Sequence, residues 1–135
     1  MKPNEACPCG SGDAYTRCCG RFHAGAPAPT PEALMRSRYS AYALQRHDYL
    51  LQTWHPTTRP ADLGDPDQAR TKWIGLQVRR AQTLPADAQG RECGLVAFVA
   101  RYRVGSRGYR LEECSRFVRE DGRWFYLAGE VSTEG

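Results

Sequence analysis

Residues 93–104, CGLVAFVARYRV, are the segment that decides the fold of this chain. Residues of both parities are apolar over its first half: Leu95, Ala97 and Val99 and, between them, Val96, Phe98 and Ala100. A strand with one buried face alternates apolar and polar residues, whereas a strand covered on both faces is apolar throughout. The segment therefore predicts the central strand of a sheet.

Neighbouring segments predict three more strands, all antiparallel. Upstream, residues 74–79 alternate in polarity and indicate a strand with one buried face, which carries Ile74, Leu76 and Val78. Downstream, a turn at residues 105–108 leads into a strand over 109–119. Asp121-Gly122 is typical of a tight hairpin turn, and it predicts a closing strand over 123–131.

The first half of the chain predicts helices instead. Thr30 is a suitable N-cap, since Pro31 follows it at the first helical position. Over Glu32–Leu44, apolar residues recur at helical spacing, namely Met35, Tyr39 and Tyr42. We expect the polar side chains of this stretch to face solvent: Arg36, Arg38 and Gln45.

Two shorter helices are also predicted. Asp48 can cap one that runs to Trp54 and ends before Pro56, and Asp65-Pro66 can open another towards Trp73. Because helices precede strands along the chain, the sequence predicts an α+β fold with the helices packed on one face of the sheet.

Length and composition are those of one ordinary globular domain. The chain has 135 residues, of which 41% are hydrophobic and 25% charged, and its net charge is +4. No long apolar run predicts a membrane helix, and the N-terminal residues have no apolar segment of the secretory type. We therefore expect a cytoplasmic protein, and the mild charge gives no argument for nucleic-acid binding, which we do not expect as its role.

Four of the six cysteines lie close together near the N-terminus, as Cys7-Pro8-Cys9-Gly10-Ser11-Gly12 followed by Cys18-Cys19. In a reducing compartment such a cluster more often binds metal than forms disulfides, although disulfides or free thiols are the alternatives. Four thiolates suit tetrahedral zinc, with Zn–S distances of about 2.3 Å. Since they leave no open position, we expect one structural zinc ion per chain and no zinc catalysis.

The residues between the cysteines have predictable roles. Gly10 and Gly12 allow tight turns that can point backbone N–H groups at the sulfurs. Asp13 can cap a single helical turn that brings Cys18 and Cys19 to the same side, and Gly20 can end that turn. We expect the nearby His23 to be a packed or solvated side chain rather than a ligand.

These segments resemble known sequences. CPCGSG with a trailing CC resembles the SEC-C motif, the zinc-binding tail of the SecA translocation ATPase. With LMRSRYSAYAL, DYLLQTWHP, KWIGL and RFVREDGRWFYLAGE, the chain is similar to the YchJ-like family of bacterial proteins. That resemblance implies metal ligands at Cys7, Cys9, Cys18 and Cys19. It also implies a nuclear transport factor 2-like fold, a strongly curved antiparallel sheet wrapped around helices.

The chain is expected to have two parts joined by the Ala- and Pro-rich residues 24–31. Residues 1–25 are the SEC-C zinc-binding segment, and residues 30–135 are the nuclear transport factor 2-like domain. The second part has a core of its own, so we expect it to stay folded when the metal is removed.

Sheets of this fold often enclose a pocket, and the sequence offers residues that could line it: Trp54, His55, Trp73, Tyr102, Glu113, Ser115 and Tyr126. Glu113 and Ser115 interrupt an apolar strand face. A buried Glu113 near the His55 imidazole could act as a general base. In the alternative interpretation Glu113 pairs with Arg101 or Arg103, and His55 ends its helix.

We favour a non-enzymatic protein whose zinc segment binds a partner protein. That function rests on analogy with SEC-C tails that bind a chaperone. The alternative is a small-molecule binder, or an isomerase- or dehydratase-like enzyme, that uses the pocket. Cys93 and Cys114 are expected to be small buried residues of the sheet.

Overall fold

The computed structural model describes residues 5–61 and 71–134. Its helical elements are η1 (Tyr15–Arg17), α1 (Cys19–His23), α2 (Pro31–Ala43) and α3 (His47–Gln52). Its strands are β1 (Thr71–Leu84), β2 (Cys93–Val104), β3 (Arg107–Glu120) and β4 (Arg123–Glu134). They form one antiparallel sheet in the order β1-β2-β3-β4. The predicted α+β class and the central strand at 93–104 are confirmed.

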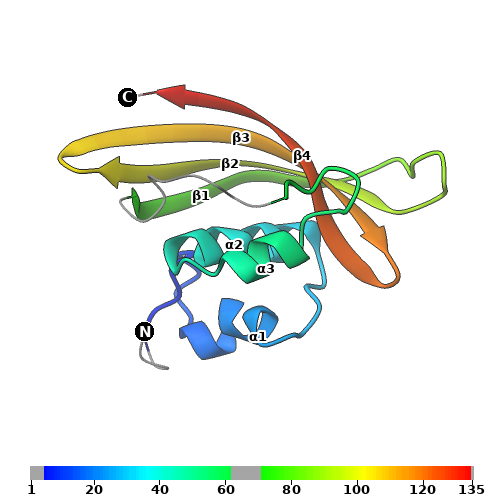
Figure 1. Cartoon of the computed structure of the whole chain (residues 1–135), viewed down its shortest axis with the longest axis horizontal. Coiled ribbons are helices and arrows are strands. Elements are labelled where there is room, and N and C mark those ends of the chain that lie inside the picture. Colours follow the sequence, from blue (N-terminus) through cyan, green and yellow to red (C-terminus); the bar gives the residue numbers. More distant parts are fainter. Residues whose placement is uncertain (1–4, 62–70, 135) are drawn as a thin grey trace.

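The elements lie in three layers (Figure 1). The curved sheet is one layer, α2 and α3 run beneath it, and the N-terminal segment with α1 lies on the far side of these helices. Helix α2 is therefore the middle layer, since it packs on α1 and also on β1, β2 and β4.

The register of the sheet places side chains of neighbouring strands next to one another on the face that meets the helices. Trp73 of β1 is opposite Tyr102 of β2. Bulges between Trp73 and Gly75 and between Val78 and Arg80 disturb the alternation of β1. The first bulge explains a wrong prediction: Ile74 is 52% exposed instead of sharing the buried face with Leu76 and Val78.

Helix α2 begins as predicted, because the Thr30 Oγ1 accepts a hydrogen bond from the Ala33 N–H at 3.0 Å. Met35 and Tyr39 are buried and Tyr42 is half-buried. The expectation that Arg38 faces solvent is wrong, since only 6% of this residue is exposed. Its place three residues after Met35 and four before Tyr42 puts it on the same buried stripe.

The chain after α3 differs from the prediction. Arg46 is the N-cap of α3 and Asp48 lies in its first turn. Trp54 is not helical but forms a parallel bridge with Tyr126 at the edge of β4. The predicted helix at Asp65-Pro66 lies outside the described residues, and its expected end at Trp73 belongs to β1.

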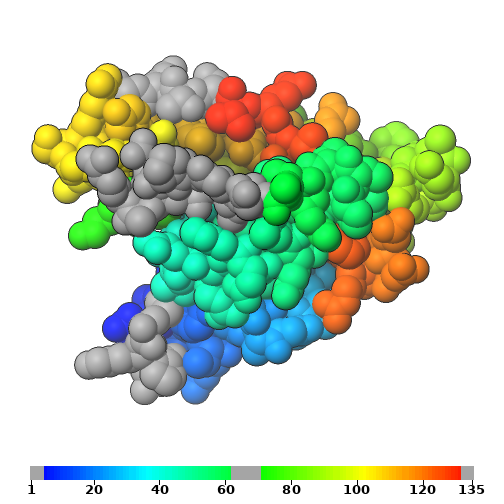
Figure 2. Space-filling model, viewed as in Figure 1, coloured from blue at the N-terminus to red at the C-terminus, as the bar shows by residue number. Residues whose placement is uncertain are grey.

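The N-terminal segment and the larger part share one hydrophobic cluster. It contains Cys7, Cys9, Cys19 and Phe22 together with Leu34, Met35, Tyr49, Val96 and Phe117. The space-filling view shows the N-terminal segment lying directly against α2 (Figure 2). Among the described residues, no helix has the length and apolar character needed to cross a membrane.

Candidate functional site

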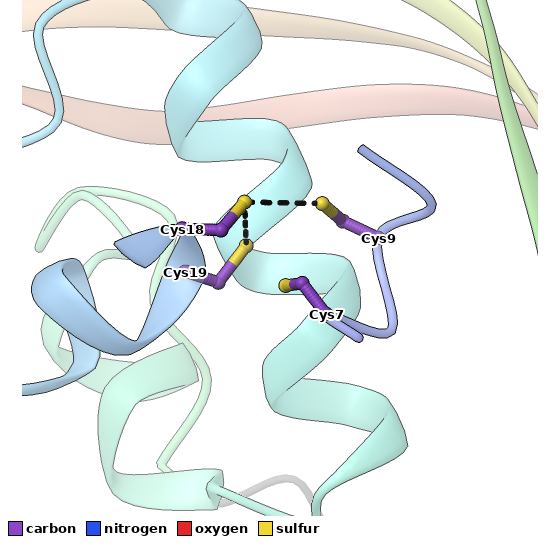
Figure 3. A group of neighbouring side chains, drawn as sticks. All are labelled: Cys7, Cys9, Cys18 and Cys19. Carbon is purple, nitrogen blue, oxygen red and sulfur yellow. Dashed lines mark hydrogen bonds between the residues drawn. The ribbon is translucent and has the colours of Figure 1, made fainter. Parts of the chain in front are cut away.

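The four N-terminal cysteines converge on one point beside α2. Cys7 and Cys9 come from the first loop, and Cys18 and Cys19 come from the junction of η1 and α1 (Figure 3). All four sulfurs lie within 4.8 Å of one another, and three of the four residues are buried. The Sγ of Cys18 is 3.5 Å from that of Cys9 and 4.0 Å from that of Cys19.

These separations fit a tetrahedral metal ion. Zn–S bonds of about 2.3 Å in a tetrahedron place the sulfurs roughly 3.8 Å apart. A set of four thiolates suits zinc or another thiophilic metal and leaves no position for a water or substrate ligand. The cluster can therefore hold a metal ion in a closed, structural site.

Polar groups around the cluster are placed to stabilise negative sulfur. The Ser11 hydroxyl lies 3.1 Å from the Cys18 Sγ, and the Ser40 hydroxyl of α2 lies 3.4 Å from the Cys7 Sγ. The backbone N–H of Cys9 also donates to the Cys7 sulfur. Gly10 and Gly12 form the predicted tight turns, with φ angles of +80° and +90°. The Gly10 N–H itself donates to the Cys7 carbonyl at 3.1 Å, so the N–H that reaches a sulfur is that of Cys9.

The thiols compete for protons when no cation is present. Hydrogen bonds from the Cys19 and Cys9 thiols hold the pKa of Cys7 well below its usual value. The same contacts with Cys7 and Cys9 raise the pKa of Cys19, and burial raises the pKa of Cys18. Since the four groups cannot all be ionised side by side, a bound cation is what would make all four thiolates stable together.

Two local predictions about the second cysteine pair are wrong. The N-cap of η1 is Ala14 and not Asp13, whose carbonyl instead accepts from the Cys7 N–H at 2.9 Å. Gly20 does not end a helix but lies inside α1. A Cβ at Gly20 would come within 2.7 Å of the Tyr15 carbonyl oxygen, so glycine is needed here for close packing of η1 on α1.

Helix α2 supports the cluster from behind. The Arg36 Nη1 donates to the Cys9 carbonyl at 3.1 Å while its Nε pairs with Glu32 at 3.0 Å. His23 uses both ring nitrogens elsewhere: its Nδ1 lies 2.6 Å from the Tyr15 hydroxyl and its Nε2 lies 2.8 Å from the Ser37 carbonyl. His23 is thus a packed residue, and neither of its ring nitrogens is available to bind a metal ion at the cysteine cluster.

A second site lies between α2 and the sheet, where a cavity of about 290 Å³ opens. Its walls are mostly aromatic and apolar, with a few polar groups among them. The lining residues that matter here are Arg38, Tyr42, Trp73, Phe98, Glu113 and Tyr126. Of the pocket residues expected from sequence, Trp73, Glu113, Ser115 and Tyr126 line it, and Trp54, His55 and Tyr102 do not.

Glu113 is held by two hydroxyl groups. Ser115 donates to its Oε2, and the Tyr126 hydroxyl is a second hydrogen-bond partner. Burial raises the pKa of the Glu113 carboxyl despite these bonds and the field of Arg38. The alternative pairing with Arg101 or Arg103 is not formed, since both arginines are exposed and Glu113 lines the cavity.

His55 lies away from this cavity. Its Nε2 is 3.0 Å from the Glu120 carboxylate and its Nδ1 is 2.8 Å from the Thr57 hydroxyl. Its ring packs on Phe125 with centroids 5.8 Å apart. Arg91 also pairs with Glu120, at 2.9 Å, so His55 belongs to a clamp that ties the segment after α3 to the β1–β2 connection and to the end of β3. The structure therefore does not bring His55 and Glu113 together as an acid–base pair.

Cys93 and Cys114 lie on β2 and β3 and are half-buried rather than fully buried. Sequence reasoning missed Arg38, which lines the cavity, and Ser40, which contacts the Cys7 sulfur. Helical spacing carried a signal for Arg38, because it shares a face with Met35 and Tyr42. Nothing in the sequence marked Ser40.

Comparison with known proteins agrees with this architecture. Residues 30–129 match the family model "YchJ, middle NTF2-like domain", and residues 4–21 match the SEC-C motif. A UPF0225 protein of Xanthomonas campestris is 52% identical over 126 residues, covering 93% of this chain and 94% of that relative. A UPF0225 protein of Chromobacterium violaceum is 54% identical over 130 residues, covering 94% and 93%.

Two solved structures share the fold. The solution structure of a SEC-C motif containing protein from Rhodopseudomonas palustris has a TM-score of 0.78 and 36% identity, covering 93% of this chain and 98% of that one. The crystal structure of another from Psychrobacter arcticus has a TM-score of 0.75 and 26% identity, covering 98% and 86%. On these matches, the chain belongs to the UPF0225 family of YchJ-like proteins, with a SEC-C motif before a nuclear transport factor 2-like domain.

Proposed function

We propose that this protein is a non-enzymatic, cytoplasmic interaction protein, in which Cys7, Cys9, Cys18 and Cys19 hold one structural zinc ion. The observation that supports a zinc site is the convergence of four sulfurs within 4.8 Å of one another. The donor set is saturated by protein, so the ion orders the loop and has no position at which to activate a substrate.

A partner would meet the outer side of the zinc segment. Its cysteines point inward, while Ser11, Gly12, Asp13, Arg17 and Arg21 are exposed. Arg21 is fixed, since its Nε donates to the Cys18 carbonyl at 3.2 Å and its guanidinium lies over the Phe22 ring. A rigid loop binds with a smaller loss of conformational entropy than a flexible one, which supports its use as a recognition surface.

Two measurements test this function. Elemental analysis of protein purified under reducing conditions should give one zinc per chain, and the double variant Cys18→Ser/Cys19→Ser should give none. Pull-down from a bacterial lysate should recover a protein partner with wild type and not with Arg17→Glu, which leaves every ligand in place. Arg80→Glu, an exposed residue of β1, is the matched control. Equal recovery with Arg17→Glu and wild type contradicts the proposed surface.

A further inference from the structure

The cavity beneath the sheet has the character of a small-molecule site. Its volume of about 290 Å³ is close to the lower end of the roughly 300–1,000 Å³ typical of ligand pockets. Trp73, Phe98 and Leu111 supply apolar walls, and Arg38 and Glu113 are the ionisable groups among them, besides tyrosines. Such a lining suits an organic molecule with an apolar body and one polar end.

Arg38 is a buried cation that is fixed in position. Its Nη1 donates to the Leu50 carbonyl at 2.8 Å and to the Thr53 hydroxyl at 2.7 Å. Its guanidinium carbon lies 4.6 Å from the centre of the Tyr126 ring and 5.2 Å from that of Trp54. These contacts leave Nε and Nη2 for the neighbouring Tyr42 hydroxyl and for a ligand.

This cation has no carboxylate partner within 4.0 Å among residues 5–61 and 71–131. Buried charges in proteins are ordinarily paired, because an unpaired one loses its hydration without compensation. Glu113 lies in the same cavity, but its carboxyl is taken up by Ser115 and Tyr126. Burial raises the pKa of Glu113, and its field favours the charged form of Arg38 without a direct ion pair between the two side chains.

We propose that this cavity binds a small organic monocarboxylate, whose carboxylate pairs with Arg38 and whose apolar body lies against Trp73, Phe98 and Leu111. The planar guanidinium matches a carboxylate through two parallel N–H bonds. Aromatic walls accommodate a ring or a short aliphatic chain. This site goes beyond the zinc-dependent interaction proposed above and does not depend on it.

The test compares two probes of nearly equal shape, phenylacetate and its neutral analogue phenylacetamide. Each is titrated into the full-length, zinc-loaded wild type and followed by ¹H–¹⁵N NMR, with intermolecular NOEs to the Trp73 ring. We expect phenylacetate to bind at least tenfold more tightly than phenylacetamide and to give NOEs to Trp73. Equal affinity for the two probes, no binding of either, or binding that perturbs only residues outside the cavity overturns the proposal.

Arg38→Met should bring the affinity for phenylacetate down to that for phenylacetamide. Arg80→Met, which removes an exposed arginine of β1, should keep the tenfold difference. If Arg38→Met does not fold, the ratio of the two affinities and the NOEs in wild type still decide. A folded Arg38→Met variant that retains the preference refutes the role given to this guanidinium.

Discussion

Replacing Gly129 by alanine should destabilise the protein through the Glu113 carboxyl. Gly129 of β4 lies opposite Ser115 of β3. A Cβ built at Gly129 would be 2.5 Å from the Glu113 Oε2, 2.8 Å from its Cδ and 2.9 Å from the Tyr126 hydroxyl. Non-bonded carbon atoms prefer separations of about 3.5–4.0 Å, so the carboxyl must move by roughly 1 Å. The glycine thus provides the space that the carboxyl occupies.

Two opposing effects set the size of the change. Moving the carboxyl breaks its hydrogen bonds from Ser115 and Tyr126, at about 0.5–1.5 kcal/mol each. Alanine in a strand is otherwise more stable than glycine by about 0.5–1 kcal/mol, because the unfolded chain has less freedom to lose. The net loss is on the order of 1 kcal/mol, which lowers Tm by roughly 3–4 °C for a domain of this size.

Guanidinium denaturation at constant zinc concentration measures the difference. Gly75→Ala is the matched control, since a Cβ there meets nothing within 4 Å, and it should be neutral or slightly stabilising. In a Glu113→Ala background the cost of Gly129→Ala should shrink, which a double-mutant cycle detects. A Gly129→Ala protein as stable as wild type, or more stable, would refute this explanation of the glycine.

Three further predictions concern the metal segment and the pH dependence of stability. Gly20→Ala should speed the loss of zinc to a chelator although all four cysteines remain, because the added Cβ would lie 2.7 Å from the Tyr15 carbonyl oxygen; an unchanged rate contradicts this. Burial raises the pKa of Glu113 above its usual 4.5, so the wild-type free energy of unfolding should fall as pH rises above that value. In denaturation curves measured across this pH range, Glu113→Gln should lack this slope. Arg91 and then His55 lower the pKa of Glu120, so the stability that Glu120 contributes is present above about pH 4.5 and is lost as pH falls. Glu120→Gln should therefore flatten the acid side of the plot of unfolding free energy against pH. An acid-unfolding midpoint identical to that of wild type would count against the clamp.

Sequence predicted the strands better than the helices. The apolar run at 93–104 predicted β2 because residues of both parities are apolar, and the structure buries residues of both parities there, such as Val96 and Val99. Bulges in β1 are not visible in its alternation, and they turn Ile74 outward. The prediction of a helix through Trp54 is wrong because local spacing cannot reveal a bridge to Tyr126, which lies 72 residues further along the chain.

The two candidate sites differ in how far sequence could predict them. Cysteine spacing alone indicated the four converging thiols, because they lie close in the chain as well as in space. Glu113 and Ser115 were marked by their parity on an apolar strand face, and both line the cavity. Placing His55 required the path of the chain after α3, which depends on long-range backbone bonds with Tyr126. A charged side chain such as Arg38 is normally assigned to the surface, and only its packing on Trp54 and Tyr126 reveals otherwise.

The middle of helix α2 has no face left for water, since every residue from Ser37 to Ala41 is buried, which is more than one full turn. We therefore expect the boundary between the two family models, between residues 21 and 30, to mark a change of sequence and not a limit of cooperative unfolding. A fragment that begins at residue 30 should keep the sheet, but it would expose Leu34, Ser37 and Ser40 to water. We expect this fragment to fold with reduced stability and to self-associate through the exposed surface of α2. Truncation studies of this family should therefore retain the cysteine segment.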